Sequence, residues 1–176
     1  MTEGNTTNSD ATDRELVITR TLDAPREFVY KAWTDPECLA QWWGPKGFTM
    51  GSLKLDLRPG GSFHYCMSSA NGFEMWGLFI YHEVVPPEKI VFVNSFSDKE
   101  GNIIRAPFSA TWPLEVYNVL TFTEQDGKTT LTLRGWPYNA TAEEQKIFEE
   151  GRSSMQQGFA GTFEQLEAFL AKTMKK

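Results

Sequence analysis

Apolar and polar residues alternate near the start of the chain. Across residues 15–23, Leu16, Ile18 and Leu22 fall on one side of an extended backbone, whereas Val17 and Thr19 fall on the other. A period of two residues in a segment rich in β-branched side chains is typical of a β-strand. We therefore predict a first strand here.

Two short helices are predicted next. Pro25 suits the first helical position of residues 24–33, in which apolar side chains recur four residues apart. Asp35 suits the cap of a second helix, which we expect to end at Gly44 and Pro45. Helices this short need tertiary packing, so their apolar faces must be buried.

Strand-like segments continue from Phe48 to Trp136. Turn residues separate them at 58–61, 70–72, 86–88 and 125–128. Successive hairpins predict an antiparallel sheet. The longest connection, residues 97–115, is a candidate lid, because long loops in compact domains are often functional.

Helical periodicity returns in residues 141–176. Thr141 and Glu144 fit a capping box, and an apolar stripe predicts one long amphipathic helix. The stripe consists of Phe148, Met155, Phe159, Thr162, Phe163, Leu166 and Leu170. The glycines of this segment indicate either a kink near Gly151 or space left facing the sheet at Gly151 and Gly158.

The order of these elements predicts an α+β fold. A curved antiparallel sheet would wrap around the C-terminal helix, with the two short helices closing one end. Residues 1–13 contain one large apolar side chain, Met1, and are predicted to form a disordered tail. Residues 14–176 would then form a single domain. One helix covers only part of a broad sheet, so we expect a cavity between them.

Composition narrows the classes of partner. The 176 residues carry a formal net charge of -6, without a long run of basic residues, which argues against nucleic acid or an anionic membrane as the main partner. Two cysteines and the lack of a long apolar segment favour a cytoplasmic protein. Aromatic residues make up 14% of the chain, and some of these rings are expected to line a cavity or an interface.

Catalytic and metal-binding patterns are weak. His64 and His82 are the only histidines, and they do not belong to a cluster with metal-ligand spacing, so we expect neither a metal nor another cofactor. Nucleophile motifs and phosphate-binding loops are absent. Polar groups that could reach a pocket include Glu83, Arg134 and Arg152, of which Arg152 could bind an anionic head group.

Six segments carry a resemblance to a known family. They read VITRTLDAPREFVYKAWTDPECLAQWWGP, DLRPGGSFHY, EVVPPEKIVF, FSDKEGN, LTFTEQDGKTTLTLRG and GFAGTFEQLEAFL. Together they span about residues 15–172 and resemble the START-like (SRPBCC) superfamily, in the branch named for the activator of the heat-shock protein 90 ATPase. The resemblance implies a helix-grip fold, in which a long C-terminal helix lies across the sheet above a hydrophobic pocket.

The resemblance also selects the sheet face that would line this pocket. The predicted ligand-binding residues are Trp42, Trp43, Phe63, Tyr65, Met67, Met75, Phe79, Tyr81, Arg134, Arg152, Met155, Phe159 and Phe163. We expect one of the two adjacent tryptophans to pack in the core and the other to lie at the cavity entrance. Phe79 stands where the family often has glycine, and its ring should shrink or reshape the pocket. On the other face, Trp76, Leu78, Ile80 and His82 suggest a homodimer or cover by the N-terminal tail.

Three functions are compatible with these features. The first is non-catalytic binding of a small hydrophobic or amphipathic molecule, such as a lipid or a polyketide-like compound. The second, implied by the resemblance, is a co-chaperone that stimulates the heat-shock protein 90 ATPase. The third is a cyclase or dehydratase, which would require Tyr81, Glu83 or Arg134 to converge in one cavity.

Overall fold

A curved antiparallel sheet forms the body of the structure. The computed structural model describes residues 15–43, 47–106 and 111–174. The strands are β1 (Leu16–Leu22), β2 (Phe48–Leu55), β3 (Ser62–Ser69), β4 (Glu74–Val85), β5 (Lys89–Ser97), β6 (Ile103–Ile104), β7 (Val116–Gln125) and β8 (Lys128–Pro137). Their order is β1-β8-β7-β5-β4-β3-β2, and the short β6 pairs with β5. The predicted α+β helix-grip fold is confirmed.

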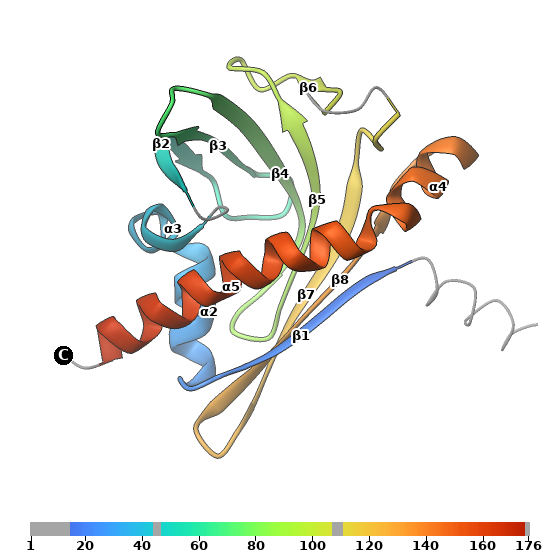
Figure 1. The fold of residues 1–176 in the computed structure, drawn as a ribbon. Coiled ribbons are helices and arrows are strands. Elements are labelled where there is room, and N and C mark those ends of the chain that lie inside the picture. Colours follow the sequence, from blue (N-terminus) through green and yellow to red (C-terminus); the bar gives the residue numbers. More distant parts are fainter. Residues whose placement is uncertain (1–14, 44–46, 107–110, 175–176) are drawn as a thin grey trace, which may run out of the picture.

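The helices lie on the concave side of the sheet (Figure 1). They are α2 (Arg26–Thr34), α3 (Pro36–Trp42), α4 (Ala142–Glu150) and α5 (Arg152–Met174). Helix α5 crosses the sheet, with α2 and α3 near its C-terminal half and α4 at its other end (Figure 1). The expected stop at Gly44 and Pro45 and the predicted tail at 1–13 lie outside the described residues.

The C-terminal segment differs from the single uninterrupted helix that the periodicity predicts. It breaks at Gly151, which caps the C-terminus of α4 before α5 begins at Arg152. The predicted capping box is present, because Thr141 accepts from the Glu144 backbone and Glu144 accepts from the Thr141 backbone. Apolar periodicity continues through both helices, so it could not reveal the break.

The main core lies where α2, α3 and the C-terminal half of α5 meet the sheet. Its fully buried side chains include Trp42, Phe63, Phe122, Phe163 and Leu166. Farther along α5, toward α4, side chains from the helix and the sheet do not fill the space between them, and a cavity remains. The core thus occupies one end of the concave face and leaves the other hollow.

The inner face of β3 and β4 carries the residues expected there. Phe63 pairs with Phe79, Tyr65 with Gly77 and Met67 with Met75. Gly77 has a specific structural role, because a Cβ added to it would overlap the Tyr65 ring. This glycine lets the tyrosine lie close against the neighbouring strand.

We therefore expect Gly77→Ala to displace Tyr65 and to lower the free energy of unfolding by about 1–3 kcal/mol, as overpacking typically does. The matched control is Gly51→Ala on β2, where an added Cβ would meet its nearest neighbour, Ser68 Oγ, at 3.8 Å. The control should change stability by less than about 0.5 kcal/mol. Urea unfolding of both variants tests this, and equal effects would show that Tyr65 does not depend on Gly77.

Candidate functional site

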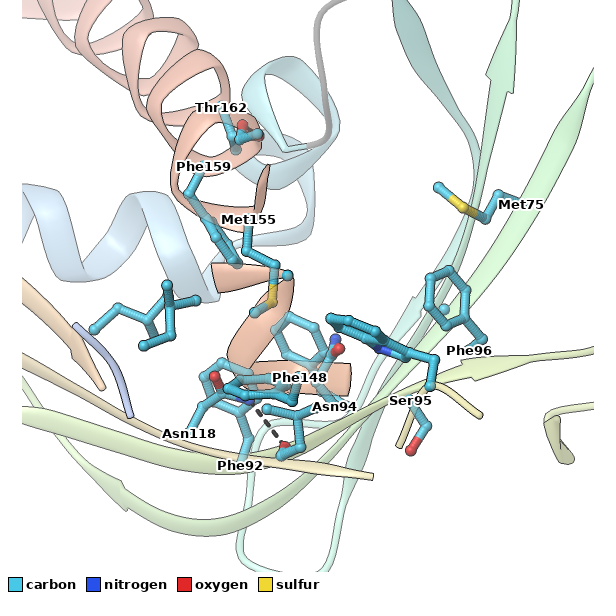
Figure 2. Close-up of a pocket in the computed structure, with 18 of the residues that line it drawn as sticks. Met75, Phe92, Asn94, Ser95, Phe96, Asn118, Phe148, Met155, Phe159 and Thr162 are labelled. Atoms are coloured by element: carbon cyan, nitrogen blue, oxygen red, sulfur yellow. Dashed lines mark hydrogen bonds between the residues drawn. The ribbon is translucent and has the colours of Figure 1, made fainter. Parts of the chain in front are cut away.

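A cavity of about 720 Å³ lies between α5 and the concave face of the sheet. Met155, Phe159 and Thr162 of α5 face Phe92, Asn94 and Asn118 of the strands (Figure 2). The other described lining residues are Leu16, Trp33, Trp43, Tyr65, Met67, Met75, Trp76, Gly77, Phe79, Ser95, Phe96, Trp112, Val116, Leu133, Ile147, Phe148, Glu150, Gly151, Ser154 and Gly158. Most of this lining is aromatic or aliphatic, as in sites for small apolar molecules.

One wall of the cavity is an aromatic cluster around Phe79. Phe79 stacks on Phe92 with ring centroids 4.2 Å apart, and Trp43 meets it edge to face at 5.5 Å. The ring of Phe79 therefore forms part of the cavity wall, and a cavity of about 720 Å³ remains beside it.

The two adjacent tryptophans separate as expected. Trp42 is 1% exposed and donates from Nε1 to the Ala32 carbonyl at 3.0 Å, which places it in the core. Trp43 is partly exposed and lines the cavity. Its indole contacts the Tyr65 hydroxyl, but Nε1 has no acceptor with hydrogen-bond geometry among the described residues.

Three uncharged polar side chains form a row across the sheet: Tyr65 on β3, Asn94 on β5 and Asn118 on β7. We call these three residues the polar row. Glycines make room for two of them, since Tyr65 lies over Gly77, and Asn118 Oδ1 lies 2.8 Å from where a Cβ of Gly135 would be. The backbone of the sheet is thus shaped to hold these polar groups.

The polar row is electrically neutral at physiological pH. Burial raises the pKa of Tyr65 to about 12, and contacts with Trp43 and Asn94 offset part of that effect. Tyr65 therefore keeps its proton and can donate a hydrogen bond. It is poorly suited to act as a general base.

Trp112, from the long connection between β5 and β7, lines the cavity beside α4. Its ring lies 5.6 Å from that of Phe148 and sits against Gly151, where an added Cβ would be 3.0 Å from Trp112 Cζ3. Arg105 ties this connection to α4, because its guanidinium donates to the Trp112 carbonyl at 3.0 Å and pairs with Glu144. Gly151 therefore both ends α4 and leaves space for this ring.

Seven of the thirteen residues proposed from the sequence line the cavity: Trp43, Tyr65, Met67, Met75, Phe79, Met155 and Phe159. Four others, Trp42, Phe63, Tyr81 and Phe163, are buried in the adjoining core. Contact of any of these residues with a ligand remains a prediction.

The two arginines do not line the cavity. Arg134 projects from the opposite face of β8 and pairs with Glu15 at 2.8 Å. Arg152 donates to the backbone carbonyl of Glu15 at 3.3 Å and to that of Glu149 at 3.4 Å. The periodicity of the sequence did not show which way these long side chains point. In the structure, a carboxylate and backbone carbonyls outside the cavity bind them.

The convergence required for a cyclase or dehydratase is not found. Tyr81 is part of the core, Glu83 pairs with Lys89 at 2.8 Å, and Arg134 pairs with Glu15.

Within the described residues, His, Cys, Asp and Glu side chains do not gather in groups of three or more that could hold a metal. In the same part of the chain, the helices are too short or too polar to cross a membrane.

Sequence reasoning missed several lining residues, above all Asn94, Asn118 and Trp112. Asn94 and Asn118 interrupt apolar strands, and Gly135 pairs with Asn118 in the sheet. Polar residues and a glycine inside strands were therefore a usable signal. Trp112 lies in an irregular connection, where periodicity gives no indication of direction.

Comparisons with known proteins agree with this fold. The family model described as Activator of Hsp90 ATPase homolog 1-like protein matches residues 23–171. Protein Ms6760 from Mycobacterium smegmatis is 29% identical, with a TM-score of 0.73 over 91% of this chain and 92% of its own. Among proteins with curated descriptions, none matches the sequence.

Two more distant structures show the same fold. A protein from Arthrobacter aurescens is 22% identical, with a TM-score of 0.75 over 92% of this chain and 88% of its own. The AHSA1 protein from Silicibacter pomeroyi is 20% identical, with a TM-score of 0.70 over 90% of this chain and 99% of its own.

The contact between Arg105 and Glu144 predicts a dependence of stability on pH. Hydrogen bonds from the Thr141 backbone and then from Arg105 hold the pKa of Glu144 below its ordinary value of 4.5. Because folding lowers this pKa, the stabilisation is complete above pH 4.5 and is lost as pH falls through the folded-state pKa. We expect Glu144→Gln to lower the free energy of unfolding at pH 7 by up to about 1 kcal/mol, since a glutamine can still cap α4 but cannot form the ion pair.

Chemical denaturation at a series of pH values measures this effect. The difference between wild type and Glu144→Gln should stay constant from neutral pH down to 4.5 and then shrink. Glu143→Gln, at an exposed residue of the same helical turn, is the control and should have little effect. A difference that persists unchanged in strong acid would contradict the assignment.

Proposed function

Because the chain belongs to the family of Activator of Hsp90 ATPase homolog 1-like proteins and contains an apolar cavity, we propose that it binds a small hydrophobic or amphipathic molecule without changing it chemically. The ligand would lie between α5 and the sheet. Aromatic rings and methionines would supply the contact surface, and the polar row would orient the molecule.

The observation that carries this proposal is the cavity of about 720 Å³, which falls within the usual range for small-molecule sites. Its lining includes Trp43, Phe79, Phe92 and Met155. Burial of about 300 Å² of ligand surface at about 25 cal/mol per Å² contributes about 7 kcal/mol before the entropy cost of association. Micromolar dissociation constants are therefore attainable.

Filling the cavity should abolish binding without unfolding the protein. Met155 lines the cavity and is partly exposed, so Met155→Trp adds ring volume to the space itself. We expect the affinity for a neutral apolar probe, N-phenyl-1-naphthylamine, to fall more than about tenfold, because the substituted ring occupies the place of the probe. Probe fluorescence measures binding, and thermal unfolding checks that the variant is folded.

The matched variant is Met155→Leu, which keeps an apolar side chain of similar size. It should bind the probe within about threefold of wild type. Equal binding by wild type and Met155→Trp would place the probe outside the cavity. Failure of wild type to bind the probe or any of a panel of fatty acids, sterols and aromatic polyketides would refute the proposal.

A chaperone-activating role is the second candidate, because the description of the matched family names the Hsp90 ATPase. This role would use the surface of the protein, so Met155→Trp and wild type should stimulate a purified Hsp90 ATPase equally. An ATPase rate that neither protein changes would exclude it.

A further inference from the structure

The cavity is almost free of formal charge. Glu150 is the only charged residue among the described lining residues, which include no Lys, Arg or His. The arginines nearest in sequence to the cavity walls, Arg134 and Arg152, have partners elsewhere. An anionic head group would therefore enter without a described cation to neutralise it and with the Glu150 carboxylate on the wall.

The polar groups of the cavity retain hydrogen-bonding capacity. Asn118 is 6% exposed, and its Nδ2 donates to the Val116 carbonyl at 3.0 Å. One Nδ2 proton and the carbonyl oxygen Oδ1 make no further hydrogen bond within the described part of the chain. The amide of Asn94 contacts the Tyr65 hydroxyl, so three groups that can each donate and accept a hydrogen bond lie in one row.

Physical chemistry then separates two classes of ligand. Moving a carboxylate from water into an apolar cavity carries a large free-energy penalty unless a cation or several donors compensate it. A carbonyl or hydroxyl group costs much less to bury, and it can pair with both donors and acceptors of neutral amides and a phenol.

We infer that the cavity selects uncharged apolar molecules that carry a carbonyl or hydroxyl oxygen, and that Tyr65, Asn94 and Asn118 recognise this oxygen. Carboxylates with the same skeleton are rejected. This inference rests on the proposed function and names the class of molecule that the cavity takes. The oxygen lies against the sheet, and the apolar skeleton extends under Met155 and Phe159 of α5 (Figure 2).

Three probes that share one ring system test the selection: 1-acetylpyrene, 1-ethylpyrene and pyrene-1-carboxylate. Energy transfer from tryptophan to pyrene reports binding to the wild-type protein at pH 7.5. We expect the ketone to bind more than about a hundredfold more tightly than the carboxylate, since the uncompensated charge opposes entry. The affinity for the carboxylate should rise as the pH is lowered and the carboxyl group becomes protonated.

Variants of the polar row test which residues recognise the oxygen. Asn118→Leu and Tyr65→Phe each remove hydrogen-bonding groups and keep the approximate shape of the side chain. Each should weaken binding of the ketone by about tenfold relative to 1-ethylpyrene, as expected for one lost hydrogen bond. Tyr65→Phe removes one hydroxyl only, so it remains informative if Asn118→Leu folds poorly. Phe122→Leu, at a buried core residue that does not line the cavity, is the control and should leave the ratio of the two affinities unchanged.

The outcomes distinguish this inference from the function on which it rests. Tight binding of the ketone, weak binding of the carboxylate and a lower ratio in both variants would support the inference. If the carboxylate bound as tightly as the ketone, or if neither variant changed the ratio, the inference would be overturned while ligand binding stood. If none of the three probes bound while N-phenyl-1-naphthylamine did, the inference alone would be overturned. If that probe and the lipid panel failed as well, ligand binding itself would fail, and the inference with it.

Discussion

The structure depends on a packed group of indole rings, Trp33, Trp42 and Trp43, between the short helices and α5. Trp42 meets Trp33 at 4.9 Å and Trp43 at 5.6 Å, and its backbone carbonyl accepts a hydrogen bond from Gln165 of α5 at 3.3 Å. Trp33 in turn contacts Phe163 of α5. These bulky rings belong to the core that fills the space between the C-terminal half of α5 and the sheet. Toward α4 the side chains do not fill that space, and the cavity lies there.

Small residues then determine the shape of the hollow. Gly77 and Gly135 let Tyr65 and Asn118 lie close to the sheet, and Gly151 gives Trp112 its place beside α4. Large rings thus fill the core beside the cavity, whereas glycines decide which side chains lie close to its walls. The packing of the rings and the space left by the glycines both depend on side-chain volume. Both also involve residues that are distant in sequence.

Sequence patterns predicted the elements far better than the site. Alternation in residues 15–23, the cap at Asp35 and the capping box at Thr141 are local features, and each is confirmed. The break at Gly151 was only one of two alternatives, because glycine is tolerated inside helices and the apolar stripe continues beyond it. Positions of long side chains such as Arg134 depend on partners that only the folded chain brings near. Asparagines inside apolar strands signal the polar row, but only the strand register sets Asn118 beside Gly135.

The polar row also limits the stability of the protein. Tyr65 and Asn118 are buried and Asn94 is partly buried. A buried polar group costs stability relative to a well-packed apolar one, by about 1–3 kcal/mol where it is left unpaired. An apolar row of the same shape would have avoided this cost. Violations of packing and hydrogen-bonding rules are expected where a protein performs its function. A molecule that supplied the missing partners would offset this cost only in the bound state, so the cost itself becomes a source of selective binding.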